Sequence, residues 1–174
     1  DQESLDYGNT HYGYFIDEKE AWFVFDEDGK FQYAETGMVT YQGETRYAVN
    51  GMLPWHVGLV QIGEDYYYFI GDTEIGGNIM ATGNVYMSRN NTDLDVVTSG
   101  VYTYGADGKL LKADGITDVN GTLYYYEDYQ LMIGAGLIKI DEDYYYVDSN
   151  GALVVNSEYW VGANSFGIAE GMHW

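Results

Sequence analysis

The sequence predicts an all-β protein in which tandem β-hairpins stack into an elongated, solenoid-like array. Three observations carry this prediction: a run of three tyrosines that occurs three times, glycine-bearing turns at short intervals, and a long internal repeat. The chain of 174 residues contains 20 Tyr, 23 Gly and a single Pro. Such a composition is typical of many short strands joined by tight turns.

The tyrosine triplets are predicted to form the centres of strands. They read DYYYF at 65–69, LYYYE at 123–127 and DYYYV at 143–147. Because successive side chains of a strand point to opposite faces, Tyr144 and Tyr146 face one way and Tyr145 the other. A single short hairpin cannot bury both of its faces. We therefore expect each hairpin to stack on its neighbours along the chain.

Tight turns are predicted between the strands. The segments DEDGK (26–30), VNG (119–121) and DSNG (148–151) contain Asp-Gly or Asn-Gly pairs. These residues supply the positive φ angles that short hairpin turns require, and Asp side chains can bond to the turn backbone. No segment shows a convincing helical period in its apolar residues, so no helix is expected.

Two collinear copies of a longer unit are visible in the sequence. Residues 58–70 align with residues 136–148. Residues 39–49 align with residues 117–127 at the same offset. An internal repeat of this kind predicts units that bury their hydrophobic faces by stacking rather than by folding around one central core.

This offset divides the chain into three predicted parts. They are an N-terminal cap or flanking segment (1–20), a first long hairpin copy (21–99) and a second long hairpin copy (100–174). The pattern seen at Trp22 and Val101 returns at Trp174, so we expect the array to continue, or to be truncated, at its C-terminal end.

The charge balance excludes several classes of partner. There are 28 acidic and 7 basic residues, a formal net charge of −21. Such a field repels phosphate backbones, so nucleic-acid binding is not expected, and an anionic membrane surface is disfavoured for the same reason. No apolar run approaches the roughly 18 residues of a membrane span, so membrane insertion is not expected. With no cysteine in the chain, thiol chemistry and disulfides are absent.

Catalytic, metal and cofactor sites are not predicted. His11, His56 and His173 are far apart, with no spacing typical of metal ligands. The carboxylates of Asp141 and Asp143 lie beside each other in a turn, whereas a glycosidase needs two acids across a cleft. The DEDG turn lacks the later ligands of a calcium loop, so a plain hairpin turn is the favoured interpretation.

At this point the chain resembles a known superfamily. The unit GLIKIDEDYYYVDSNGALVVN (136–156) is similar to the cell-wall-binding repeats of Gram-positive bacteria, which include choline-binding modules, glucan-binding repeats and clostridial toxin C-terminal repeats. The long organisation resembles arrays on surface proteins of gut clostridia. The resemblance covers residues 21–174. It implies stacked β-hairpins, a secreted or cell-surface location, no enzymatic activity, and a cell-wall polymer or other glycan as partner.

Choline is a less favoured ligand than a glycan. Choline-binding units usually open with Gly-Trp, and that tryptophan forms part of an aromatic cage for the quaternary ammonium. The equivalent positions here read GM at 37–38, GL at 58–59, GI at 115–116 and GL at 136–137. Without the tryptophans the cage loses its best cation–π wall.

A glycan site would use aromatic side chains left exposed in grooves between units. Trp55 and Trp160 are the leading candidates, because each follows a predicted strand and has polar neighbours. The predicted carbohydrate-binding residues are Trp55, Tyr66, Tyr68, Tyr144, Tyr146 and Trp160. The alternative is a structural spacer or display stalk without a small ligand, in which the aromatic residues serve only to stack the hairpins.

Overall fold

The computed structural model is all-β, as predicted, and the part of the chain that it describes contains no helix. The described residues are 6–7, 10–14, 20–26, 28–31, 35–41, 43–55, 57–73, 77–88 and 99–173. Within these ranges no helix has the length and apolar character needed to cross a membrane. His56, Trp174 (where a third copy is predicted to begin) and much of the predicted N-terminal segment lie outside the described residues.

The described residues form antiparallel strands that follow one another at short intervals. Their bounds are β1 (Asp6–Tyr7), β2 (Thr10–Tyr14), β3 (Glu20–Val24), β4 (Gly37–Tyr41), β5 (Glu44–Ala48), β6 (Met52–Pro54), β7 (Gly58–Ile62), β8 (Asp65–Gly71), β9 (Asn78–Met80), β10 (Gly83–Met87), β11 (Gly100–Tyr104), β12 (Gly115–Val119), β13 (Thr122–Glu127), β14 (Gln130–Leu131), β15 (Gly136–Ile140), β16 (Asp143–Val147), β17 (Tyr159–Val161) and β18 (Gly171–His173).

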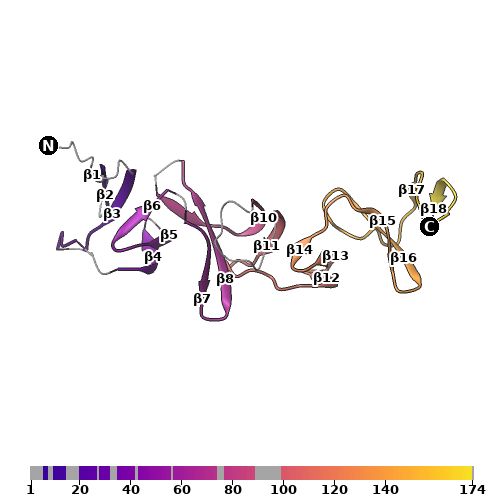
Figure 1. Ribbon diagram of the computed structural model, residues 1–174, viewed down its shortest axis with the longest axis horizontal. Helices are drawn as coiled ribbons and strands as arrows, with labels where there is room; N and C mark the ends of the chain where they lie inside the picture. Colours follow the sequence, from indigo (N-terminus) through magenta and orange to yellow (C-terminus); the bar gives the residue numbers. More distant parts are fainter. Residues whose placement is uncertain are drawn as a thin grey trace.

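The molecule is an elongated array rather than a closed sheet or barrel. Figure 1 shows the hairpins succeeding one another along the long axis, with the two termini at opposite ends. The strands group into separate small sheets: β1-β2-β3-β6, β4-β5, β7-β8-β9, β10-β11-β14-β13-β12, β15-β16 and β17-β18. The predicted stack of tandem hairpins is therefore confirmed.

The hairpins recur with the offset seen in the sequence. Strand β4 begins at Gly37 and β12 at Gly115, the same offset that separates residues 58–70 from residues 136–148. The registers also agree, because Met38 lies opposite Tyr47 and Ile116 lies opposite Tyr125. The hairpins β7–β8 and β15–β16 stand in the same relation. The division of the chain into two long copies at residue 99 stays a prediction.

A second recurring feature joins one hairpin to the next. Strand β3 pairs with β6 through Trp22 and Leu53, and β11 pairs with β14 through Val101 and Leu131. In each case a short strand that comes later in the chain (β6 or β14) pairs with the free edge of an earlier strand (β3 or β11). This strand addition lets small hairpins cover edges that would otherwise be open to solvent.

The turn chemistry that the sequence predicts is present. Asn120 and Gly121 both have positive φ, at 55° and 85°, as a two-residue turn of type I′ requires. The carboxylate of Asp118 accepts a hydrogen bond of 2.7 Å from the Gly121 N–H. Turn residues and strand register therefore specify the same hairpin.

The largest described core lies between the hairpin β7–β8 and the hairpin β10–β11. This internal core consists of Leu59, Tyr68, Ala81, Met87, Tyr102, Tyr104 and Leu110. The rings of Tyr68 and Tyr104 stack with centroids 6.2 Å apart, and the Tyr104 hydroxyl lies 2.8 Å from Sδ of Met87. Burial raises the pKa of Tyr104, with smaller contributions from the neighbouring tyrosines. The tyrosines of this core are therefore buried packing residues.

A buried polar cluster, which the sequence analysis did not anticipate, ties β5, β6 and β9 together. Arg46 is fully buried and forms an ion pair of 2.7 Å with Asp72. The amide of Asn78 accepts from the Tyr47 N–H and donates to the carbonyls of Tyr47 and Pro54, at 2.8, 3.0 and 2.8 Å. The Asn78 side chain therefore acts as a surrogate strand partner, and we call Arg46, Asp72 and Asn78 the polar clasp.

Candidate binding groove

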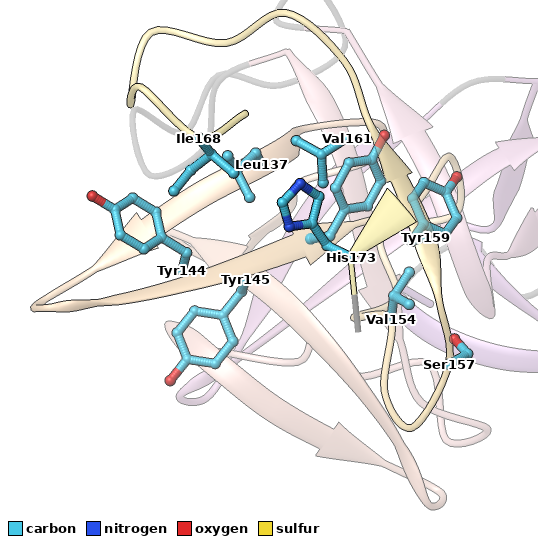
Figure 2. A pocket seen from close by; sticks show the side chains of 10 residues that line it. Leu137, Tyr144, Tyr145, Val154, Ser157, Tyr159, Val161, Ile168 and His173 are labelled. Carbon is cyan, nitrogen blue, oxygen red and sulfur yellow. The ribbon is translucent and has the colours of Figure 1, made fainter. Parts of the chain in front are cut away.

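The candidate site is a groove between the hairpins β15–β16 and β17–β18, near the C-terminal end of the array. Its volume is about 290 Å³. The residues that line it are Leu137, Tyr144, Tyr145, Tyr146, Val154, Ser157, Tyr159, Val161, Ile168 and His173. Figure 2 shows these side chains, which come from both hairpins, from the segment between the hairpins and from the loop that joins β17 to β18. We call this feature the C-terminal groove.

Two tyrosines from different hairpins form a close ring–ring contact in the groove. Tyr146 comes from β16 and Tyr159 from β17, and their ring centroids are 4.2 Å apart with planes tilted by 41°. Burial raises the pKa of Tyr146, and the neighbouring Tyr159 hydroxyl raises it further through charge repulsion and a hydrogen bond. The Tyr146 phenol therefore holds its proton more tightly than an ordinary tyrosine does, and its hydroxyl is engaged with that of Tyr159.

Tyr144 presents a second aromatic surface at the edge of the groove. Its ring meets Phe166 edge to face, with centroids 5.7 Å apart. The ammonium of Lys139 lies 5.5 Å from the Tyr144 ring centroid, within the range of a cation–π contact. Tyr144 and Phe166 are both exposed to solvent. Flat, exposed aromatic rings of this kind can stack on the C–H face of a sugar ring.

His173 is the histidine that lines the groove. Its Nε2 lies 2.7 Å from the carbonyl oxygen of Ala169, so a ring nitrogen is engaged locally. In Figure 2 the imidazole lies among the side chains of Leu137, Val161 and Tyr159. No group of three or more potential His, Cys, Asp or Glu ligands converges anywhere in the described part of the chain.

The six predicted residues occupy different environments. Tyr144 and Tyr146 line the groove, whereas Trp160 lies on β17 between two lining residues and is 58% exposed. The side chain of Trp160 points to the opposite face from its neighbours, as strand alternation requires. Tyr68 is only 4% exposed and packs in the internal core. Tyr66 is partly buried, and its ring is covered by the ammonium of Lys112 at 5.0 Å.

Trp55 lies in a separate region of the array, directly after β6. It is 40% exposed. Its indole lies against the backbone of Gly71 so closely that a Cβ on that glycine would be 2.6 Å from indole Cε2 and Nε1. Gly71 precedes Asp72 of the polar clasp, and the carbonyl of Pro54 is held by Asn78. The clasp and the glycine therefore fix the position of an exposed indole.

Sequence reasoning missed several residues of the groove. Tyr159, Phe166 and Leu137 were not singled out, although EYWV at 158–161 carries the same alternation as the tyrosine triplets. Strand alternation could have found Tyr159. Because Tyr159 and Trp160 are neighbours on one strand, their side chains point to opposite faces, so only one of the two can face the groove. Phe166 lies in an irregular segment, where no periodicity exists to indicate which side chains converge.

Comparison by sequence gives one distant relative. No protein-family model matches the chain. Over 184 aligned residues the chain is 26% identical to glucosyltransferase-S of Streptococcus mutans. The alignment covers 94% of this chain but 12% of that protein, so the chain spans a small part of its relative.

Comparison by structure identifies the fold. Choline-binding protein F from Streptococcus pneumoniae matches with a TM-score of 0.54 over 86% of this chain and 45% of that one, at 19% identity. The same protein in the presence of a peptidoglycan analogue matches with a TM-score of 0.52, over 79% and 39% of the two chains, at 23% identity. The chain has the fold of the choline-binding repeat proteins. The predicted resemblance to the cell-wall-binding repeats is thereby confirmed for the fold, and identities this low concern the fold alone.

Proposed function

We propose that this chain is a non-catalytic repeat module of an extracellular protein, and that it attaches the protein to a cell-wall polymer or another glycan. The single observation that supports this most is the C-terminal groove with its tyrosines Tyr144, Tyr146 and Tyr159. The likeness to glucosyltransferase-S and to choline-binding protein F, which has been crystallised in the presence of a peptidoglycan analogue, favours the same function class.

The chemistry of the groove suits a sugar polymer. Aromatic rings stack on the apolar faces of sugars, while the phenol hydroxyls and Ser157 can exchange hydrogen bonds with sugar hydroxyls. The lining contains no tryptophan, and the ring of Tyr144 already lies beside the ammonium of Lys139. A quaternary ammonium would have to compete with that lysine, so a glycan is favoured over choline.

A structural spacer is the second candidate function. It is favoured by the internal core, where tyrosines of the same type are buried between hairpins. In a spacer the groove aromatics would likewise serve only packing. The two functions differ in one measurable respect, because only the binding module is retained by an immobilised polymer.

The test is co-sedimentation of the chain with purified Gram-positive cell walls and with insoluble glucan, each with and without free choline. We expect retention that choline does not reverse. Tyr144→Ala and Tyr159→Ala should each weaken retention by about tenfold or more, the effect of removing a central aromatic contact. Tyr86→Ala is the matched control, because Tyr86 is a 65% exposed tyrosine on β10 outside the groove.

The outcomes separate the candidates. Unchanged retention of a folded Tyr159→Ala variant would remove the groove from the binding surface. Retention that free choline abolishes would identify choline as the ligand. If the unmodified chain sediments with none of these polymers, the spacer function is favoured. Melting curves of all variants show whether a loss of retention reflects unfolding.

A further inference from the structure

The lining of the C-terminal groove is uncharged, although the chain as a whole is strongly acidic. Its polar members are four tyrosines, Ser157 and His173. None of the described residues that line the groove is an Asp, Glu, Lys or Arg, whereas the chain contains 28 acidic and 7 basic residues. Hydroxyl groups both donate and accept hydrogen bonds, as the hydroxyls of a sugar do. The lining therefore suits a ligand that is polar and carries no charge.

The groove also offers little that could hold an anion. Bound phosphates and carboxylates are typically held by Arg or Lys side chains or by the N-terminus of a helix. The described part of the chain contains no helix. Residues 136–173 contain six acidic residues and a single cation, Lys139, which gives a net charge of −5 with His neutral. Lys139 is exposed, and its ammonium lies over the ring of Tyr144 rather than among the lining residues.

Exposed carboxylates stand beside the groove on both of its sides. Asp143 directly precedes Tyr144 on β16. Glu158 lies between the lining residues Ser157 and Tyr159. Asp143 and Glu158 are exposed, and neither lines the groove. We call these two residues the acidic rim.

The acidic rim is close enough to the groove for its charge to act on a bound ligand. Adjacent residues of a strand are only about 3.3 Å apart along the chain. The Debye length is about 10 Å at 0.1 M ionic strength, so salt does not screen the rim from a ligand that contacts the neighbouring lining residues. A negative group on the ligand is therefore repelled from both sides, whereas an uncharged sugar is not.

We propose that Asp143 and Glu158 determine the specificity of the C-terminal groove by excluding anionic polymers, so that the groove binds uncharged stretches of a glycan. This inference rests on the proposed function, because it names the class of glycan that the same groove takes. A polymer that carries phosphate or carboxylate groups is repelled by the rim and meets no cation in the lining. A cationic group meets the ammonium of Lys139, which already covers the ring of Tyr144. An uncharged segment avoids both and keeps its stacking and hydrogen bonds.

The experiment varies the charge of the polymer and of the rim separately. The polymers are insoluble glucan, the same glucan after carboxymethylation, and cell walls before and after removal of their phosphate-bearing polymers. Retention is measured at about 0.1 M and about 1 M salt, between which the Debye length falls from about 10 Å to about 3 Å. The rim variant combines Asp143→Asn with Glu158→Gln. Its matched control combines Glu44→Gln with Glu64→Gln, which removes the same charge from two exposed residues outside the groove.

We expect the unmodified chain to be retained at least about tenfold better by glucan than by carboxymethylated glucan at the lower salt concentration, and this ratio should shrink at the higher one. The rim variant should gain about threefold or more in retention on the carboxymethylated form and gain nothing on the uncharged form. The control should behave like the unmodified chain. Walls stripped of their phosphate-bearing polymers should retain the chain at least as well as intact walls.

The outcomes distinguish this inference from the proposed function. Equal retention on the two forms of glucan, equal gains for the rim variant and its control, or loss of retention when walls are stripped overturns the inference and leaves the proposed function standing. If neither form of glucan and neither wall preparation retains the unmodified chain, the proposed function is overturned and the inference with it.

Discussion

Tyr146 and Tyr159 pack against each other in the lining of the C-terminal groove, with their ring centroids 4.2 Å apart. The two tyrosines belong to different sheets, β15-β16 and β17-β18, so their contact joins hairpins through side chains. Burial, together with the proximity of the two phenols, raises the pKa of Tyr146. The pair therefore joins two hairpins, offers a surface to a ligand and contains a titratable group.

Alkaline pH should destabilise the array. Burial raises the pKa values of Tyr104, Tyr126 and Tyr146, and it raises that of Tyr125 to about 12 with help from Glu127, against an ordinary value of 10.0. The folded chain therefore holds these phenol protons more tightly than the unfolded chain. The stabilisation is complete below about pH 10 and is lost as the pH rises through the folded pKa values.

Urea unfolding followed from neutral pH into this range should show the decline, with tyrosinate absorbance reporting the titration. Tyr146→Phe should make the decline shallower. Tyr86→Phe should leave it unchanged, because Tyr86 is exposed. Stability that stays constant above about pH 10 would contradict the interpretation of these tyrosines as buried phenols.

Removing a side chain of the polar clasp should lower the free energy of unfolding. Asn78→Ala removes three hydrogen bonds and leaves the N–H and the carbonyl of Tyr47 and the carbonyl of Pro54 without that partner. We expect a loss of about 2–4 kcal/mol in the free energy of unfolding. Asn84→Ala is the control, because Asn84 is an exposed asparagine whose side chain accepts a hydrogen bond from the Thr103 hydroxyl. Equal losses for the two variants would show that the clasp adds nothing.

Alanine substitutions at two glycines with nearly the same φ angle distinguish backbone strain from steric crowding of the added methyl group. Gly121 and Gly151 have φ of 85° and 84°. A Cβ on Gly121 would meet nothing within 4 Å, whereas a Cβ on Gly151 would be 2.7 Å from Cδ1 of Leu131. Both alanine variants carry the strain of positive φ. Gly151→Ala should cost about 1–3 kcal/mol more in thermal or urea unfolding, the typical cost of overpacking a core.

The outcome of this comparison bears on the stack itself. Leu131 belongs to β14, which is added to β11, so the contact with Gly151 joins successive hairpins. If both variants lose the same free energy of unfolding, the turn at Gly151 does not depend on close packing against β14.

The sequence predicted the hairpins well because their determinants are local. The Asn120-Gly121 turn, the tyrosine triplets and the constant offset between the repeats each specify a register without reference to distant residues. The polar clasp could not be predicted in this way. Arg46 and Asp72 lie far apart in the sequence, and only the stacking of β5 on β9 brings them together.

Only part of the groove could be predicted, because only some of its determinants are local in the sequence. Tyr144 and Tyr146 follow from strand alternation, which the sequence displays. Tyr159 and Phe166 join them only because the hairpin β17–β18 folds back against β16, a contact between elements with no shared sequence pattern. Alternation also gives no measure of burial, so Tyr68 in the internal core and Tyr146 in the groove have the same local pattern.

The last prediction asks whether the indole of Trp55 contacts a ligand or only covers the backbone beneath it. The position of the ring depends on Gly71, where a Cβ would be 2.6 Å from indole atoms. The φ angle of Gly71 lies outside the left-handed region, so Gly71→Ala adds a methyl group without backbone strain. Gly71→Ala therefore displaces the ring and keeps it, whereas Trp55→Ala removes it.

If Trp55 is part of the glycan-binding surface, both variants should weaken retention on the polymer by about tenfold while melting stays nearly unchanged, because an exposed contact residue leaves no core cavity. If the indole is structural cover, Trp55→Ala should cost about 3–5 kcal/mol of stability instead. Gly162→Ala is the matched control, since its Cβ meets nothing within 4 Å. A Gly71→Ala variant whose tryptophan fluorescence shifts while retention stays at the control level would exclude Trp55 from the binding surface.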